Sequence, residues 1–268
     1  MKRTLTGLAL APLLAALFLA PLWAVTLCVA ALSMRAAYEL MRRWPHPVKT
    51  RVKIWGCGFI LVLYALIYTD AGLYTYMAAL FFFTLILFIE VMADSQKFTF
   101  FGLVGVLFAA AAIPLMYAPV ARLTFRPERL YIVLIPFLVT IISDTFAYFT
   151  GRLLGKHKLA PDISPNKTVE GAIGGYAACI AAMLGYGAVI SALGGTVDTA
   201  RLALYAAAGG LVSQMGDLAM SAAKRSLGVK DFGRLFPGHG GVLDRFDSLL
   251  FVAPVIEMLV VVLPAIHS

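Results

Sequence analysis

Residues 72–93 read GLYTYMAALFFFTLILFIEVMA, and Glu90 is the one acidic or basic side chain in this stretch. A helix needs about 20 predominantly apolar residues to cross the hydrocarbon core of a bilayer. Inside that core the backbone N–H and C=O groups must be satisfied within the protein, which favours a helix. The stretch therefore predicts a membrane-spanning helix.

The same pattern recurs along the rest of the chain. Similar apolar segments lie at 4–20, 22–42, 53–69, 99–120, 129–150, 168–192, 199–223 and 243–265. The sequence shows no repeat of fixed period and no low-complexity linker. We therefore expect an all-α integral membrane protein with about nine transmembrane helices, folded as one polytopic domain over residues 1–268.

Composition supports this class. Of the 268 residues, 61% are hydrophobic and 13% are charged, and the mean hydropathy is +0.89. A soluble domain is roughly 45–50% apolar and about 25% charged. The net charge of +8 fits the positive-inside rule and attraction to anionic lipid. Membrane lipids, and no nucleic acid, are the partners that this composition predicts.

The N-terminus, Met1-Lys2-Arg3 before an apolar run, also resembles a signal peptide. A second apolar run begins directly after Pro21, so a helical hairpin is the better interpretation. With the N-terminus in the cytoplasm, 18 of the 22 Lys and Arg residues fall on the cytoplasmic side. The four exceptions are Arg122, Arg126, Arg129 and Arg201. An odd number of helices then places the C-terminus outside.

The segment at 199–223 carries a polar stripe. Ser213, Asp217 and Ser221 are spaced four apart and share one helix face, and Lys224 and Arg225 follow within a turn. Such a stripe in a membrane helix has to face the protein interior or a wet cavity. Hydroxyls alone would suggest hydrogen bonds between helices. An aspartate that runs into two cations favours a functional site.

The connection after this segment combines glycines, cations and carboxylates. Backbone amides and basic side chains suit a polyphosphate, and carboxylates suit the magnesium ion that accompanies it. Asp244, Asp247 and Ser248 have the spacing of one helix face. The other candidates here are Lys230, Arg234, Gly238, His239, Gly240, Gly241 and Arg245.

A second unusual connection lies at 151–167. Asn166 or Thr168 can cap the next helix, and Lys167 beside a helix N-terminus is a natural phosphate ligand. Asp144, within the preceding segment, needs a partner, which Lys167 or a metal could supply. Gly171 and Gly175 form a G-x-x-x-G step that predicts close helix packing.

These residues carry a family resemblance. The stretch Ser221–Asp247 resembles the signature of the phosphatidate cytidylyltransferases, also called CDP-diglyceride synthetases. The runs 164–171 and 143–151 are similar to that family as well. The resemblance covers 140–250, which we expect to be the catalytic core, whereas 1–130 agrees only in consisting of hydrophobic helices. One departure is Met220, where family members often carry Glu.

The resemblance implies a reaction between CTP and phosphatidate that yields CDP-diacylglycerol and diphosphate with a divalent metal. It implies catalytic roles for Asp217, Asp244, Lys224 and Ser221, and magnesium ligation by Asp217, Asp244 and Asp247. A second cation would be K⁺ or another Mg²⁺. The phosphate- and CTP-binding candidates are Asn166, Lys167, Arg225, Lys230, His239, Gly240, Gly241, Arg245 and Asp144. We also expect the protein to lie in a bacterial cytoplasmic membrane with its active site facing the cytoplasm. A homodimer is compatible with these expectations.

Two other functions remain open at this point. Another CTP-using lipid enzyme, such as a CTP-dependent polyprenol kinase or a cytidylyltransferase for a different lipid, could share the phosphate-binding loops. A transporter would suit helices that are interrupted by glycine and proline and carry acidic residues. Against a transporter, the sequence shows no inverted repeat, and the polar residues gather at one cytoplasmic edge.

Overall fold

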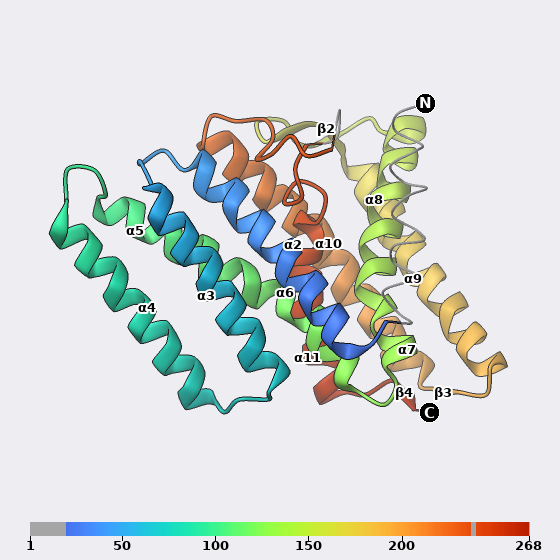
Figure 1. The fold of residues 1–268 in the computed structure, drawn as a ribbon. Helices are drawn as coiled ribbons and strands as arrows, with labels where there is room; N and C mark the ends of the chain where they lie inside the picture. Colours follow the sequence, from blue (N-terminus) through green and yellow to red (C-terminus); the bar gives the residue numbers. More distant parts are fainter. Residues whose placement is uncertain (1–19, 237–239, 268) are drawn as a thin grey trace. The chain divides into compact units, whose positions relative to one another are not determined.

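A computed structural model describes residues 20–236 and 240–267 (Figure 1). The predicted segment 4–20, up to residue 19, and the candidates Gly238 and His239 lie outside the described residues. The chain divides into two compact units. Unit 1 comprises Met1–Arg122 and Leu227–Arg245, and unit 2 comprises Leu123–Ser226 and Phe246–Ser268.

Unit 1 is built from long apolar helices. They are α2 (Leu22–Arg43), α3 (Thr50–Tyr68), α4 (Leu73–Ala93), α5 (Phe100–Leu107) and α6 (Ile113–Arg122), with a π-helical turn at Phe108–Ala112. The helix α2 packs against α3 and α6. The π turn divides the predicted segment 99–120 just before Pro114, which has no N–H to donate to the preceding turn.

Polar side chains in unit 1 are paired across its helices. The hydroxyls of Ser33 and Tyr64 lie 2.7 Å apart, and Tyr64 also bonds to the carbonyl of Pro114 at 3.2 Å. Glu90, 3% exposed, accepts from Lys49 at 2.7 Å and forms an ion pair with Arg51. These pairs give Glu90 a structural role.

Unit 2 contains the second half of the predicted helices. They are α7 (Arg129–Ile132), α8 (Leu134–Leu154), α9 (Val169–Ala192), α10 (Thr199–Ser226) and α11 (Asp247–Val262), preceded by a 3₁₀ turn at Leu123–Phe125. The helix α8 lies along α9, and α10 packs against α8, α9 and α11 (Figure 1). The segment predicted from residue 243 becomes helical only at Asp247.

The predicted G-x-x-x-G step between α8 and α9 is confirmed. A Cβ atom on Gly171 would lie 2.6 Å from the carbonyl oxygen of Ala147. A Cβ atom on Gly175 would lie 2.5 Å from the carbonyl oxygen of Ser143. Both distances are too short for a real side chain, so the two glycines allow the backbones to approach closely.

Two small antiparallel strand pairs interrupt the predicted all-α pattern. β1 (Lys158–Ala160) pairs with β2 (Ser164–Thr168), and β3 (Thr196–Val197) pairs with β4 (Ile266–His267). β1, β2 and β3 lie in connections between helices, and β4 follows α11. The β1–β2 hairpin turns at Pro161-Asp162, a sequence typical of turns.

Six helical segments in the described part of the chain are long and apolar enough to cross a membrane. They are Leu22–Arg43, Thr50–Tyr68, Leu73–Ala93, Phe100–Phe125, Arg129–Leu154 and Val169–Ala192. The helix α11 has only 16 residues, and polar residues such as Gln214 and Asp217 lower the hydropathy of α10. The chain is therefore a mostly helical membrane protein.

Candidate active site

The polar stripe of α10 carries the first cluster of unit 2. The hydroxyl of Ser221 donates to Oδ1 of Asp217 at 3.4 Å, which confirms that they share a face. Lys167 of β2 places its Nζ 2.5 Å from Oδ2 of Asp217. Ser213 on the same stripe is fully buried, and its hydroxyl has no hydrogen-bond partner within the described residues.

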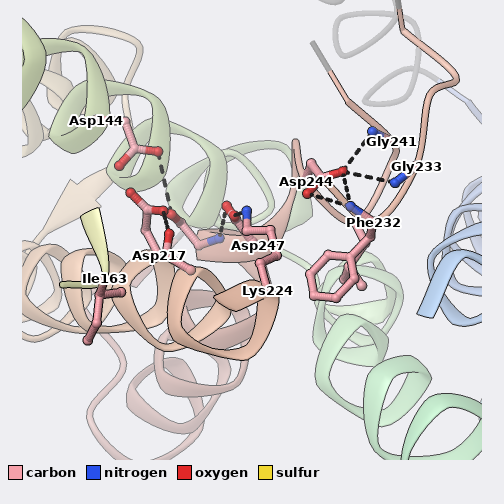
Figure 2. Close-up of polar contacts among 12 residues, drawn as sticks. Asp144, Ile163, Asp217, Lys224, Phe232, Gly233, Gly241, Asp244 and Asp247 are labelled. Carbon is pink, nitrogen blue, oxygen red and sulfur yellow. Dashed lines mark hydrogen bonds and ion pairs between the residues drawn. The ribbon is translucent and has the colours of Figure 1, made fainter. Parts of the chain in front are cut away.

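Two more aspartates reach this cluster from neighbouring helices (Figure 2). Asp247, at the start of α11, lies 3.3 Å from Nζ of Lys224 and accepts from the amide of Ser248 at 2.9 Å. The hydroxyl of Ser248 donates to Asp144 of α8 at 3.5 Å. Asp144 interacts electrostatically with both Asp217 and Asp247. Three carboxylates from three helices thus gather beside two lysines.

This arrangement follows from a balance of charge. Carboxylates that lie close together in a shielded site repel one another, and an adjacent cation favours their ionised form. Lys167 and Lys224 supply two such cations. Lys167, one of the two predicted partners of Asp144, interacts with it electrostatically, and its direct ion pair is with Asp217.

The donor chemistry of the cluster fits a hard cation. Carboxylate oxygens are ligands that Mg²⁺ accepts. Asp217 and Asp247 supply such oxygens, and Asp144 lies nearby. Among residues 20–236 and 240–267, no three His, Cys, Asp or Glu side chains form a ready metal cage. Mg²⁺ usually keeps several waters and is bound by one or two carboxylates together with phosphate oxygens. A dedicated cage is therefore not required.

The hairpin that carries Lys167 is fixed in unit 2 by several contacts. Thr168 caps α9 by accepting from the amide of Gly171 at 3.1 Å, so Thr168 and not Asn166 is the cap. Nε of Arg225 donates to the carbonyl of Ile163 at 3.3 Å. Arg225, predicted to bind phosphate, thus also positions the hairpin, and Asn166 is exposed.

Glu170 supports the other end of this hairpin. Its carboxylate accepts from the amides of Lys156 at 3.0 Å and His157 at 3.2 Å. It also lies 2.6 Å from Nδ1 of His157. These bonds, in the first turn of α9, account for an acidic residue at this position.

Unit 1 holds the remaining sequence candidates. The carboxylate of Asp244 accepts from the amides of Phe232 at 2.9 Å, Gly233 at 3.2 Å and Gly241 at 2.8 Å (Figure 2). Gly240 has a φ of +84°, a conformation that favours glycine. The loop is therefore wound around the Asp244 carboxylate.

The predicted sharing of one metal by Asp217 and Asp244 stays a prediction, because the two residues belong to different units. Lys230 and Arg245 are exposed in the same part of unit 1. Their predicted phosphate-binding roles stay predictions.

Sequence reasoning missed Glu39 of α2. This residue is 2% exposed, accepts from Nε of Arg35 at 3.0 Å and accepts from the amide of Leu243 at 3.1 Å. The signal was present in the sequence. Arg35, Glu39 and Arg43 recur every four residues within an apolar segment, and charges inside such segments are functional candidates.

Comparison with known proteins identifies the family. The profile of the cytidylyltransferase family matches residues 1–263. The chain belongs to the cytidylyltransferase family. The resemblance found in the sequence is thereby confirmed at the level of the family.

Curated relatives of this cytidylyltransferase-family chain include three staphylococcal proteins named phosphatidate cytidylyltransferase. Over 136 residues the chain is 45% identical to the Staphylococcus saprophyticus protein, 44% identical to the Staphylococcus haemolyticus protein and 44% identical to the Staphylococcus aureus protein. The matched stretch covers 51% of this chain and 51% of each relative. The chain thus spans about half the length of the curated relatives it matches.

Proposed function

We propose that this chain is a phosphatidate cytidylyltransferase, which converts CTP and phosphatidate into CDP-diacylglycerol and diphosphate. The observation that carries the proposal is the cluster of Asp144, Asp217 and Asp247 with Lys167 and Lys224 in unit 2 of a membrane protein. The two lysines of such a cluster can bring two anionic substrates, CTP and phosphatidate, together. The names of the staphylococcal relatives support the same substrates.

The reaction places simple demands on the protein. An oxygen of the phosphatidate phosphate attacks the α-phosphorus of CTP, and the bond to the bridging oxygen of diphosphate breaks. Because phosphatidate is already an anion, no strong general base is needed. Transfer of this kind depends mainly on positioning and on neutralising charge. Lys167 and Lys224 are the cations in the cluster that perform this task.

A bound Mg²⁺ supplies further neutralisation of phosphate oxygens and of the leaving diphosphate. The residues that would hold it are Asp217 with Asp247 or Asp244, and Asp144 is the next candidate. A second cation would be K⁺ or another Mg²⁺. Ser221, through its bond to Asp217, would help to orient that carboxylate.

The membrane arrangement is part of the proposal. It has nine transmembrane helices in one polytopic domain, with the N-terminus in the cytoplasm, the C-terminus outside and the active site on the cytoplasmic side of a bacterial inner membrane. Residues 140–250 form the catalytic core, and a homodimer is compatible with it. The basic asymmetry of the connections supports this topology. Reporter fusions at Lys2 and Ser268 test it, since both termini on one side would remove a helix.

The decisive experiment uses purified protein with phosphatidate, magnesium and CTP labelled at the α-phosphorus. We expect label in a lipid product, and we expect a chelator to abolish it. A CTP-dependent lipid kinase would instead transfer label only from the γ-phosphorus. Label in lipid from γ-labelled CTP alone would therefore replace the proposed function by the kinase.

A further inference from the structure

The helix α2 carries a charged face inside unit 1. Arg35, Glu39 and Arg43 are four residues apart, so their side chains lie along one face of the helix. Nε of Arg43 donates to the carbonyl of Phe232 at 3.2 Å, and Glu39 accepts from the amide of Leu243 at 3.1 Å. The helix thus holds the loop 232–243 at Phe232 and at Leu243, on either side of residues 237–239, which lie outside the described residues.

The loop has the sequence that this contact requires. A buried carboxylate is tolerated when it is paired and hydrogen-bonded, and Glu39 is 2% exposed. A Cβ atom on either Gly233 or Gly241 would collide with the Glu39 carboxyl group. Glycine at both positions therefore lets the loop backbone close over this side chain.

A second carboxylate holds the same loop from within. Asp244 accepts from the amides of Phe232, Gly233 and Gly241 at distances from 2.8 to 3.2 Å. Glu39 and Asp244 together occupy amides along the inner side of the loop. These bonds hold the backbone at 232–233 and 241–243, close in sequence to Lys230, Arg234 and Arg245.

We infer that Glu39 is a positioning residue for CTP. It holds the described parts of the loop, 232–236 and 240–243, in the shape in which Arg234 and the backbone of Gly240 and Gly241 are presented to the nucleotide phosphates. Glu39 acts through the loop and does not touch the substrate. The inference rests on the proposed function, and it gives the N-terminal helices a part in nucleotide binding.

The test compares Glu39→Gln with Glu90→Gln in the full chain. Glu90 is a matched control in the same unit, because it is 3% exposed and its ion pairs are with Lys49 and Arg51, which are not residues of the loop. For Glu39→Gln we expect the KM for CTP to rise about tenfold while the KM for phosphatidate changes less than about twofold. For Glu90→Gln we expect both KM values to stay within about twofold of the wild type.

Hydrogen exchange provides a readout that does not depend on activity. Glu39→Gln should speed exchange of amides in 232–243 about tenfold and leave the helices of unit 2 unchanged. Unchanged loop exchange, or equal KM effects in both variants, would overturn the inference.

If Glu39→Gln does not insert, Gly241→Ala replaces it, with Gly58→Ala as its control because a Cβ atom there meets nothing within 4 Å. A wild type that labels no lipid overturns the proposed function and the CTP role, and the exchange data then decide only whether Glu39 anchors the loop.

Discussion

Nζ of Lys167 lies 2.5 Å from Oδ2 of Asp217. The pair joins β2, at the entrance to α9, to the middle of α10, two regions that the sequence singled out for separate reasons. Each side chain is 26% exposed, so the pair is within reach of a ligand without being fully solvated. The contact brings the 164–171 run and the polar stripe of α10 into one site.

Asp217→Asn should abolish most of the activity. The substitution keeps the shape of the side chain but removes a negative charge that faces Lys167 and a metal ligand, so we expect a loss of at least about 100-fold in kcat. Initial rates with α-labelled CTP at saturating magnesium measure this loss. Asp198→Asn, on the exposed start of α10, is the control and should keep near wild-type rates. Retention of more than about a tenth of the turnover by Asp217→Asn would contradict a metal role.

Lys224→Ala should weaken the use of CTP. Lys224 is 12% exposed and lies beside Asp247, and a hydrogen bond to a charged group is worth about 1.5–3 kcal/mol. We therefore expect kcat/KM for CTP to fall at least about tenfold. Lys53→Ala, in α3 of unit 1, should change little. Equal losses in the two variants would point to general surface charge.

Gly175→Ala should destabilise the pairing of α8 with α9. The added Cβ atom would lie 2.5 Å from the carbonyl oxygen of Ser143, and such overpacking costs about 1–3 kcal/mol. Gly185→Ala in the same helix meets nothing within 4 Å, so the helix propensity of alanine should leave it neutral or slightly stabilised. Thermal unfolding in detergent compares the two. If the Gly175→Ala protein is as stable as the Gly185→Ala protein, then α8 and α9 can move apart without a loss of thermal stability.

The sequence predicted the helices of the described chain well because a membrane span needs a long apolar run. The segments 22–42, 72–93 and 168–192 agree with α2, α4 and α9 within a residue or two. The π turn at 108–112 was not predictable from hydropathy, since it depends on the backbone around Pro114. The strands β1 to β4 were missed because they are two to five residues long and lie outside the helices.

The sequence predicted which residues form the site better than it predicted which of them pair with one another. Spacing on α10 correctly placed Ser221 beside Asp217. Spacing cannot tell which carboxylate a lysine will meet from another element, so the pairs Lys167–Asp217 and Lys224–Asp247 required the structure. The spacing of Arg35, Glu39 and Arg43 marks Glu39 as a charged position in a helix, but its distant partner is the backbone amide of Leu243, and backbone amides leave no mark in a sequence.

Asp244→Asn distinguishes a metal ligand from a residue that organises the loop. Both roles predict a large loss of activity, because the carboxylate accepts three amides and an amide side chain would turn one acceptor into a donor. A metal ligand should also raise the magnesium concentration needed for half-maximal rate, by about tenfold or more. A purely loop-organising role should raise the KM for CTP and leave the magnesium requirement unchanged. Titration of magnesium at saturating CTP separates the two, with Asp231→Asn, an exposed position just before the loop, as the control.

The chemical step should invert the configuration at the α-phosphorus of CTP. A single displacement by phosphatidate inverts that centre, whereas two displacements through a covalent cytidylyl-enzyme would restore it. Ser221 is the plausible covalent nucleophile on the α10 stripe, but its hydroxyl donates to Asp217 at 3.4 Å. A carboxylate is a weak base for a serine hydroxyl, and nucleophilic serines are activated by a stronger base such as histidine. The sequence within 15 residues of Ser221 contains no histidine.

CTP of defined chirality at the α-phosphorus, followed by stereochemical analysis of the CDP-lipid, measures the outcome. Ser221→Ala should accordingly retain turnover, with a loss of about tenfold or less from a less well oriented Asp217. Retained configuration together with an inactive Ser221→Ala protein would establish the covalent route instead.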